Sequence, residues 1–233
     1  MSSGTSIRLV LGSLAGPLFV GSFTAIGARR AGYDRRRHAV SSLATGRSGW
    51  LQRANFVLNG LLYLLAASGL VRCPRRVVGS RAVPMLVGDA GAGLVGSGVF
   101  VTDPVGGFPP ASSAENGAGI AVPKRGSQSL SGALHNLCAI PVFIGIPVAG
   151  MLCAASAVRH KEYRWAGFSA RSSLAMVGSS VLFGAAFGGA PRLAANGGIL
   201  QRVSIAAAFG WLSALSLRGL ASPPASCPPR SRA

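Results

Sequence analysis

Six stretches of this chain are long, apolar and almost free of charge. Each approaches the roughly 20 residues that an α-helix needs to cross a bilayer, and none shows the two-residue alternation of a barrel strand. We therefore predict an all-α fold, a six-helix transmembrane bundle with short basic loops and one long irregular loop at about 103–131. The predicted spans lie at about 9–28, 54–71, 82–102, 136–158, 172–191 and 199–217.

Proline and glycine define the other segments. The connection 103–131 holds four prolines and several glycines, which would interrupt any regular helix. Residues 1–221 thus form a single transmembrane domain, and the proline-rich segment 222–233 is predicted to be a disordered tail. A cleaved signal peptide is the alternative interpretation of the first span, although its apolar run is long and only Arg8 precedes it.

The composition places most of the chain in lipid rather than in water. Only 12% of the 233 residues are charged, against roughly 25% in soluble domains. The net charge of +18 calls for anionic partners, but the basic residues cluster in loops beside the apolar spans and lack interleaved aromatic residues. This pattern predicts contacts with the lipid bilayer and its anionic headgroups, and no nucleic acid. A membrane partner subunit or a homo-oligomer stays open.

Six spans would place both termini on the same side of the membrane. That side would hold 12 basic residues and the opposite side 11, so the positive-inside rule barely separates the two orientations. The short, dense loops 72–81 and 159–171 favour cytoplasmic termini. We expect this orientation in a prokaryotic plasma membrane.

Other residue patterns predict how the spans pack. Small residues four positions apart let helices approach closely in lipid, prolines within a span produce kinks, and tryptophan anchors helices at the interface. The residues concerned are Gly12 and Gly16; Gly88, Ala92 and Gly96; Gly184 and Gly188; Pro17, Pro141 and Pro147; and Trp50 and Trp211.

No signature of metal binding or of a cofactor is present. The four cysteines lack C-x-x-C spacing, and three histidines and five acids are scattered over the chain, so we expect neither a metal nor a cofactor. Asp89 is an intramembrane acid, which is costly and therefore informative. It is interpreted either as part of a proton or cation relay or as a hydrogen-bonded packing group.

Polar residues gather at one face of the predicted bundle, opposite the termini. Alternating helix direction brings there the starts of the second, fourth and sixth spans and the end of the third. The candidate binding residues are Arg53, Asn55, Asp103, His135, Gln201 and Arg202, and the candidate catalytic residues are Asp103 and His135. Either an interfacial belt or a polar pocket would explain them. We predict that Arg53 or Arg202 neutralises Asp103, because a lone carboxylate is costly at the headgroup level.

Several short motifs follow one another in order along the chain. They are Tyr33-Asp34, Arg37-His38, Ser41-Ser42-Leu43-Ala44, the runs 49–56 and 98–104, Phe108-Pro109-Pro110, Leu134-His135-Asn136-Leu137, Arg164-Trp165-Ala166 and Gln201-Arg202. Through these motifs the chain resembles the bacterial and archaeal membrane family called domain of unknown function 998. The resemblance covers residues 8–220 and is most specific at 33–56 and 98–110. The resemblance implies a six-helix membrane protein and carries over no cofactor or catalytic residue. Members usually have His-Gly-x-Leu-His before the fourth helix, where Ser131 replaces the first His.

Two classes of function stay open. The six spans and the missing catalytic constellation favour a non-enzymatic, multi-pass membrane protein: a small transporter, a lipid-interacting protein or a partner subunit. The alternative is a membrane-embedded enzyme that acts on lipid or headgroup chemistry, with Asp103 and His135 as acid and base. A transporter would show a polar path through the bundle, and an enzyme would bring Asp103 within hydrogen-bond reach of His135.

Overall fold

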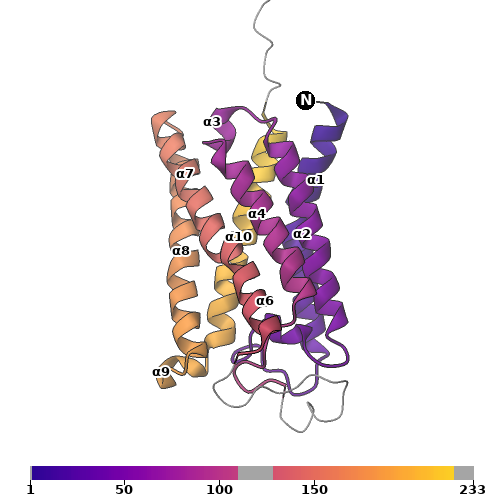
Figure 1. Ribbon diagram of the computed structural model, residues 1–233. Helices are drawn as coiled ribbons and strands as arrows, with labels where there is room; N and C mark the ends of the chain where they lie inside the picture. The colour runs from indigo at the N-terminus through magenta and orange to yellow at the C-terminus, as the bar shows by residue number, and fades with distance from the viewer. Residues whose placement is uncertain (1, 110–127, 223–233) are drawn as a thin grey trace, which may run out of the picture.

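The computed structural model describes residues 2–109 and 128–222, in which long helices run up and down side by side (Figure 1). This confirms the all-α prediction for the described part of the chain, where Val105 and Phe108 form an isolated β-bridge. The helical elements are α1 (Ser3–Ala28), η1 (Ser41–Ala44), α2 (Trp50–Leu70), α3 (Arg75–Val78), α4 (Ala82–Val99), α6 (Leu130–Ile140), η2 (Pro141–Gly145), α7 (Ile146–Arg159), α8 (Tyr163–Phe187), α9 (Pro191–Ala194) and α10 (Gly197–Leu220).

Five helical segments are long and apolar enough to cross a membrane, which matches five of the six predicted spans. They are Ser3–Ala28, Ala82–Val99, Leu130–Arg159, Tyr163–Phe187 and Gly197–Leu220. The difference is α2, which has 21 residues and packs between α1 and α4 but carries Gln52, Arg53, Asn55 and Asn59 in its first half. Its Gln52, Asn55 and Asn59 are buried inside the bundle, whereas Leu58 and Leu61 are exposed on its outer face. Three of these four polar side chains therefore face the protein interior, whereas Arg53 is exposed.

Glycines allow α2 and α4 to approach backbone to backbone. A Cβ atom at Gly60 would lie 2.6 Å from the carbonyl oxygen of Gly91, and one at Gly91 would lie 2.8 Å from that of Gly60. The predicted small-residue face of the first span is confirmed, since a Cβ at Gly16 would lie 2.7 Å from the carbonyl oxygen of Phe209 in α10. The prediction is wrong for Gly184, where a Cβ would meet nothing within 4 Å.

Large aromatic side chains fill the centre of the bundle. Trp211 is 1% exposed, and its indole N–H donates to the hydroxyl of Ser169 at 3.0 Å. The prediction of an interfacial anchor is therefore wrong for Trp211, because a buried hydrogen-bond acceptor satisfies its polar end. Trp50 is 63% exposed, as an anchor would be.

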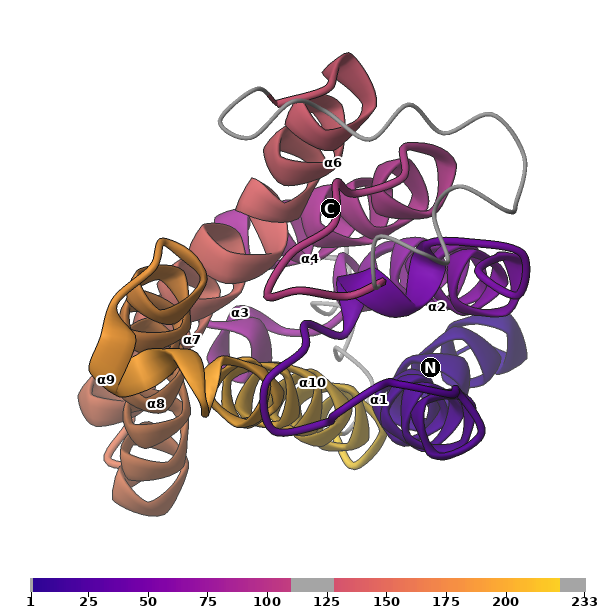
Figure 2. The same cartoon turned by 90° about the horizontal axis from the view of Figure 1, so that it is seen from below.

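The fourth long segment changes character at Pro141. A proline has no backbone N–H to continue the α-helical ladder, and the five residues Pro141–Gly145 adopt a π-helical turn between α6 and α7. Below this turn α6 packs against α4, and above it α7 packs against α8. The segment thus leans across the bundle, and Figure 2 shows the lower part of α6 standing apart from α8.

The end of the bundle that carries η1, α9 and residues 100–109 is called the lower end (Figure 1). Residues 29–49 pass beneath the bundle from α1 to α2 (Figure 2). The predicted irregular loop is non-helical from 103 to 109, and α6 begins at Leu130. Residues 110–127 of that loop and 223–233 of the predicted tail lie outside the described residues. The start of α1, the end of α10 and α3 lie together at the opposite, upper end.

Candidate functional site

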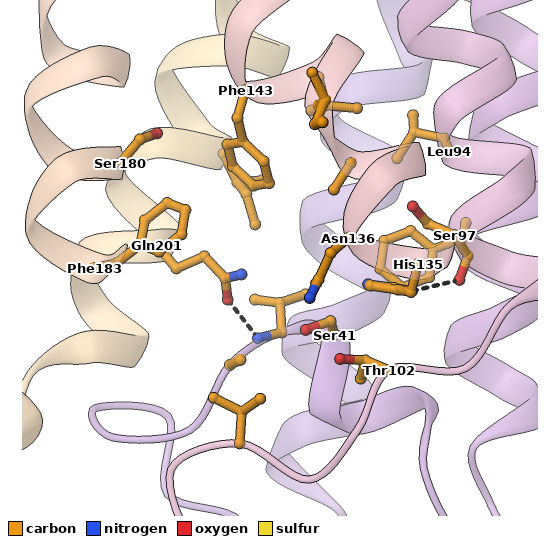
Figure 3. A pocket seen from close by; sticks show the side chains of 18 of the residues that line it. Ser41, Leu94, Ser97, Thr102, His135, Asn136, Phe143, Ser180, Phe183 and Gln201 are labelled. Atoms are coloured by element: carbon orange, nitrogen blue, oxygen red, sulfur yellow. Dashed lines mark hydrogen bonds between the residues drawn. The ribbon is translucent and has the colours of Figure 1, made fainter. Parts of the chain in front are cut away.

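A cavity of about 470 Å³ lies in the lower half of the bundle, between α6 and η2 on one side and α8 and α10 on the other, with Phe143 of η2 packed edge-to-face on Phe183 of α8 (Figure 3). Ile140 and Ile144 line it and are about half exposed, so the cavity reaches the outer surface of the bundle between these helices. Most of its wall is apolar. Its aromatic lining consists of Phe19, Phe56, Phe143, Phe183, Phe187 and Phe209.

Polar groups collect on the side of the cavity that faces the lower end. This side is formed by η1, by α4 and the segment after it, and by α6 and α10, so the tertiary fold alone assembles its residues Ser41, Ser97, Thr102, His135, Asn136 and Gln201. Ser180 of α8 also lines the cavity but lies higher, level with Phe143 (Figure 3). None of the described residues that line this cavity carries a charged side chain.

His135 is held at one edge of the cavity by backbone carbonyl groups. Its Nδ1 lies 3.1 Å from the carbonyl oxygen of Ser97 and 2.9 Å from that of Phe100. Carbonyl oxygens only accept hydrogen bonds, so Nδ1 carries a proton, and in the neutral imidazole Nε2 is a free acceptor. The ring is buried and packs edge-to-face on Phe56. Figure 3 shows the Nε2 side of this ring directed into the cavity.

Gln201 contributes from the opposite wall. Its Oε1 accepts the backbone N–H of Val40 at 2.7 Å, which fixes the loop before η1 against α10. The side-chain NH₂ group points into the cavity (Figure 3). The amide of Asn136 lies between Gln201 and His135 in this view. Two of the candidate binding residues, His135 and Gln201, thus line the same cavity.

Arg202 does not line this cavity; it binds the loop that follows α1. Its Nη1 donates to the carbonyl oxygens of Arg35 at 2.8 Å and Gly198 at 3.0 Å, and its Nη2 donates to the hydroxyl of Tyr33 at 2.6 Å. The guanidinium also lies 5.6 Å from the centre of the Phe23 ring. Arg202 is thus a structural clamp for the loop.

A second cavity, of about 480 Å³, lies beside this clamp. Its lining is Phe23, Thr24, Gly27, Ala28, Arg30, Tyr33, Asp34, Arg35 and Arg202. Burial lowers the pKa of Arg30 and raises the pKa of Tyr33. The positive charge of Arg202 offsets part of this rise, because it lowers the pKa of Tyr33. Three of its nine lining residues are arginines, so this cavity, unlike the first, offers positive charge to a ligand.

Asp103 binds Ser129, the N-cap residue of α6, and makes no ion pair with Arg53 or Arg202. Its Oδ2 accepts the backbone N–H of Ser129 at 3.0 Å and its Oδ1 accepts the Ser129 hydroxyl at 2.6 Å. Within the described residues, the ion pairs within 4 Å involve Glu162. The predicted neutralisation by Arg53 or Arg202 is therefore wrong, because the N–H and hydroxyl of Ser129 and the positive dipole end of α6 stabilise the carboxylate instead.

No hydrogen bond joins Asp103 to His135 either, since the bonds of each go to the groups described above. The acid and base suggested from the sequence are therefore not hydrogen-bonded to each other. Ser131, which replaces the first His of the motif, bonds to the segment after α4: its hydroxyl accepts from the backbone N–H of Val101 at 2.8 Å. This contact and the hydrogen bonds between Asp103 and Ser129 hold the start of α6 beside the end of α4.

Arg53 and Asn55 also serve the fold rather than the cavity. Arg53 Nε donates to the carbonyl oxygen of Gly98 at 3.0 Å and thereby caps the end of α4, where a cation is favourable. Asn55 is buried, and its Nδ2 donates to the carbonyl oxygen of Phe19 at 3.2 Å, which ties α2 to α1. Of the six candidate binding residues, the cavity therefore contains His135 and Gln201.

A column of buried polar side chains follows α2 upward from the lower end. Gln52, Asn55, Asn59 and Tyr63 recur every three or four residues and share one face of the helix. Asn59 Nδ2 donates to Asn55 Oδ1 at 2.9 Å, and Asn55 Nδ2 donates to Gln52 Oε1 at 3.3 Å. Gln52 Nε2, Asn59 Oδ1 and the Tyr63 hydroxyl have no partner within the described structure. The column runs about 16 Å into the bundle at 1.5 Å per residue.

Asp89 lies on the exposed outer face of α4 and lines neither cavity. The intramembrane acid is therefore not connected to the polar pocket. In the described part of the chain, no three His, Cys, Asp or Glu side chains are grouped as metal ligands would be.

Sequence reasoning missed the serines of the cavity and its aromatic wall. Ser97 and Ser180 lie inside apolar stretches, where one serine is indistinguishable from a helix-packing residue. Ser41 lies within the motif 41–44, and this motif is the sequence feature that could have identified Ser41 as a cavity residue.

The fold and the cavity define a class: an α-helical protein of the membrane type, with a partly polar cavity inside its bundle. The particular family follows from a family model described as "Protein of unknown function (DUF998)", which matches residues 13–218. The chain therefore belongs to the DUF998 family, as the motifs indicated. No curated protein and no solved structure matches it.

Proposed function

We propose that this chain is a multi-pass, six-span membrane protein that binds an amphiphilic lipid in the cavity between α6 and α8, without transforming it. One observation carries the proposal: among the described residues the cavity wall is mostly apolar, it reaches the outer surface at Ile140 and Ile144, and most of its polar side chains gather towards the lower end. An acyl or isoprenoid chain would enter from the bilayer, and its polar head would meet the polar groups near the headgroup level. The volume of 470 Å³ falls within the roughly 300–1,000 Å³ of ligand pockets.

The exposed surface supports the membrane setting, including that of α2. Large apolar side chains are exposed along the outer faces of the long helices, for example Leu14, Leu61, Val148 and Leu174. An apolar surface of this extent is costly in water and ordinary in lipid. The polar residues of α2 are buried, so this helix is also compatible with a lipid-facing position.

Photolabelling tests the proposal. The purified protein in lipid nanodiscs is irradiated with a long-chain lipid carrying a diazirine in its chain, and labelled peptides are identified by mass spectrometry. We expect labels in both the α6–η2 segment and α8. Ala139→Phe, which fills the cavity, should suppress these labels, whereas Ala175→Phe, the same change on the exposed face of α8, should keep them. Equal labelling of all three proteins would contradict the proposal.

A second candidate function is proton transport, which the buried polar column of α2 favours. The column lies directly behind the cavity wall, since Tyr63 stacks on Phe209 at 5.4 Å. Proteoliposomes containing a trapped pH-sensitive dye would report proton movement after a pH jump. Transport through the column predicts a flux that Asn59→Leu abolishes and Ala175→Phe leaves intact. A flux no greater than that of protein-free liposomes would exclude this function.

The surroundings of the protein are part of the same proposal. Anionic headgroups are its partners at the lower end, where the second cavity presents Arg30, Arg35 and Arg202. The chain resides in a prokaryotic plasma membrane with its termini in the cytoplasm. A reporter enzyme that is active only in the cytoplasm, fused after residue 222, tests the orientation, because an inactive, stably expressed fusion would reverse it.

A further inference from the structure

The headgroup chemistry of the cavity can be inferred from its hydrogen-bonding groups. Among the described residues, every polar side chain that lines it is uncharged, and the arginines nearest in the sequence to its polar residues are engaged elsewhere: Arg202 clamps the loop after α1, and Arg53 caps α4. An anionic headgroup would therefore lose its hydration here without gaining a cation from the described lining, which is unfavourable in a cavity of low polarity.

The two best-placed groups are complementary. Both carbonyl partners of His135 lie at Nδ1, so Nε2 is left as a hydrogen-bond acceptor that faces the cavity. The Oε1 atom of Gln201 is occupied by the Val40 N–H, so its NH₂ group is left as a donor that faces the same cavity. Each residue is at most 7% exposed, so neither group is fully solvated without a ligand. A head that satisfies both must donate one hydrogen bond and accept another.

We propose that the cavity selects a long-chain molecule with an uncharged hydroxyl head, whose O–H donates to His135 Nε2 and whose oxygen accepts from the Gln201 NH₂ group. This inference rests on the proposed lipid-binding function and narrows it to one headgroup class. Asn136 and Ser41 can each donate and accept, so they accommodate a second hydroxyl of a diol or a monoacylglycerol. Long-chain alcohols and monoacylglycerols share this chemistry.

Competition against the photoreactive lipid separates the headgroup classes. The competitors share one chain and end in an alcohol, a methyl ether, a carboxylate, a phosphate or a 1-glyceryl ester, at a mildly alkaline pH that ionises the acids. We expect the alcohol or the glyceryl ester to compete best. The methyl ether, which cannot donate, should be about tenfold weaker, the usual cost of one buried hydrogen bond. The relative strength of the alcohol and the glyceryl ester identifies which of the two the site prefers.

A matched pair of variants tests the role of His135. His135→Asn keeps an N–H near the position of Nδ1 and removes the acceptor at Nε2, whereas Ala175→Phe leaves the cavity untouched. In His135→Asn the alcohol should weaken about tenfold, to the level of the ether, while the ether itself is unchanged. A loss of affinity for the alcohol but not for the ether indicates a direct hydrogen bond to His135. A structural effect of the substitution would weaken both competitors alike.

The outcomes are distinct. If the carboxylate or the phosphate competes as well as the alcohol, the headgroup inference is overturned while lipid binding stands. If the alcohol and the ether weaken equally in His135→Asn, the assigned hydrogen bond is overturned. If no competitor displaces the probe, and Ala139→Phe labels like the wild type, the proposed function fails together with the inference.

Discussion

Replacing Asp103 with alanine removes the carboxylate that holds Ser129, the N-cap residue of α6, and the loss of stability can be worked from the structure. The carboxylate accepts two hydrogen bonds from Ser129, whose hydroxyl in turn accepts the Gly132 N–H at 2.9 Å. Hydrogen bonds to a charged group contribute about 1.5–3 kcal/mol each when buried, but Asp103 is only half-buried. Allowing for this exposure and adding the helix dipole, we expect a loss of about 2 kcal/mol. For a chain of this size, that lowers Tm by roughly 4–8 °C.

Thermal unfolding in detergent, followed by circular dichroism, measures this loss. A double-mutant cycle identifies its source. Asp103→Ala and Ser129→Ala should be strongly non-additive, because they remove the same contacts. Asp103→Ala and Arg53→Ala should be additive within about 0.5 kcal/mol, because the two residues share no hydrogen-bond partner.

Gly132 provides an independent check on the same contact. A Cβ atom at this position would collide with the carboxylate of Asp103. Gly132→Ala should therefore destabilise the wild type and have a smaller effect in the Asp103→Ala background. The reasoning is refuted if Arg53→Ala or Arg202→Ala couples to Asp103→Ala as strongly as Ser129→Ala does, since the ion pair expected from the sequence would then be present.

Two further predictions concern the loop and the helix packing. Burial lowers the pKa of His38 below 6.5, and His38 Nδ1 accepts the N–H of Asp34 at 2.9 Å. The unfolded chain therefore binds the proton first as the pH falls below about 6.5, and the free energy of unfolding drops by up to about 1.4 kcal/mol per pH unit. His38→Gln should lack this slope in unfolding curves between about pH 8 and pH 5; an equal slope would exclude His38 as the cause. Gly91→Ala should destabilise the protein by about 1–3 kcal/mol through overpacking, whereas Gly184→Ala should be neutral or stabilising by up to about 1 kcal/mol; equal Tm shifts would contradict the α2–α4 contact.

How far the sequence predicted the site can be judged from its six candidate residues. Helix direction alone brought them to one end of the bundle, and His135 and Gln201 do line one cavity there. The partners of Arg53, Asp103 and Arg202 were not predictable in the same way. Each of these side chains forms hydrogen bonds with free backbone groups at a helix end or in a loop. Such groups occur in every fold, and no sequence motif identifies them.

The sequence by itself was sufficient to predict that the chain lies mostly in lipid and that its long apolar segments are helices. Long apolar runs with few charges can satisfy their backbone in lipid only as helices, and this constraint does not depend on how the helices are arranged. The motifs between 33 and 110 likewise sufficed to indicate the family, without any knowledge of packing.

Only the tertiary structure decided which polar groups share a cavity and which residues are buried. The turn at Pro141–Gly145 leans α6 away from α8 and opens the cavity, and the same packing buries Trp211 and the polar face of α2. The physical reason is that hydropathy describes how polar a residue is but not which residues surround it. The neighbours of a residue depend on how the helices cross and where the loops run. Both are set by contacts between residues far apart in the chain, such as Gln201 with Val40 and Asp103 with Ser129.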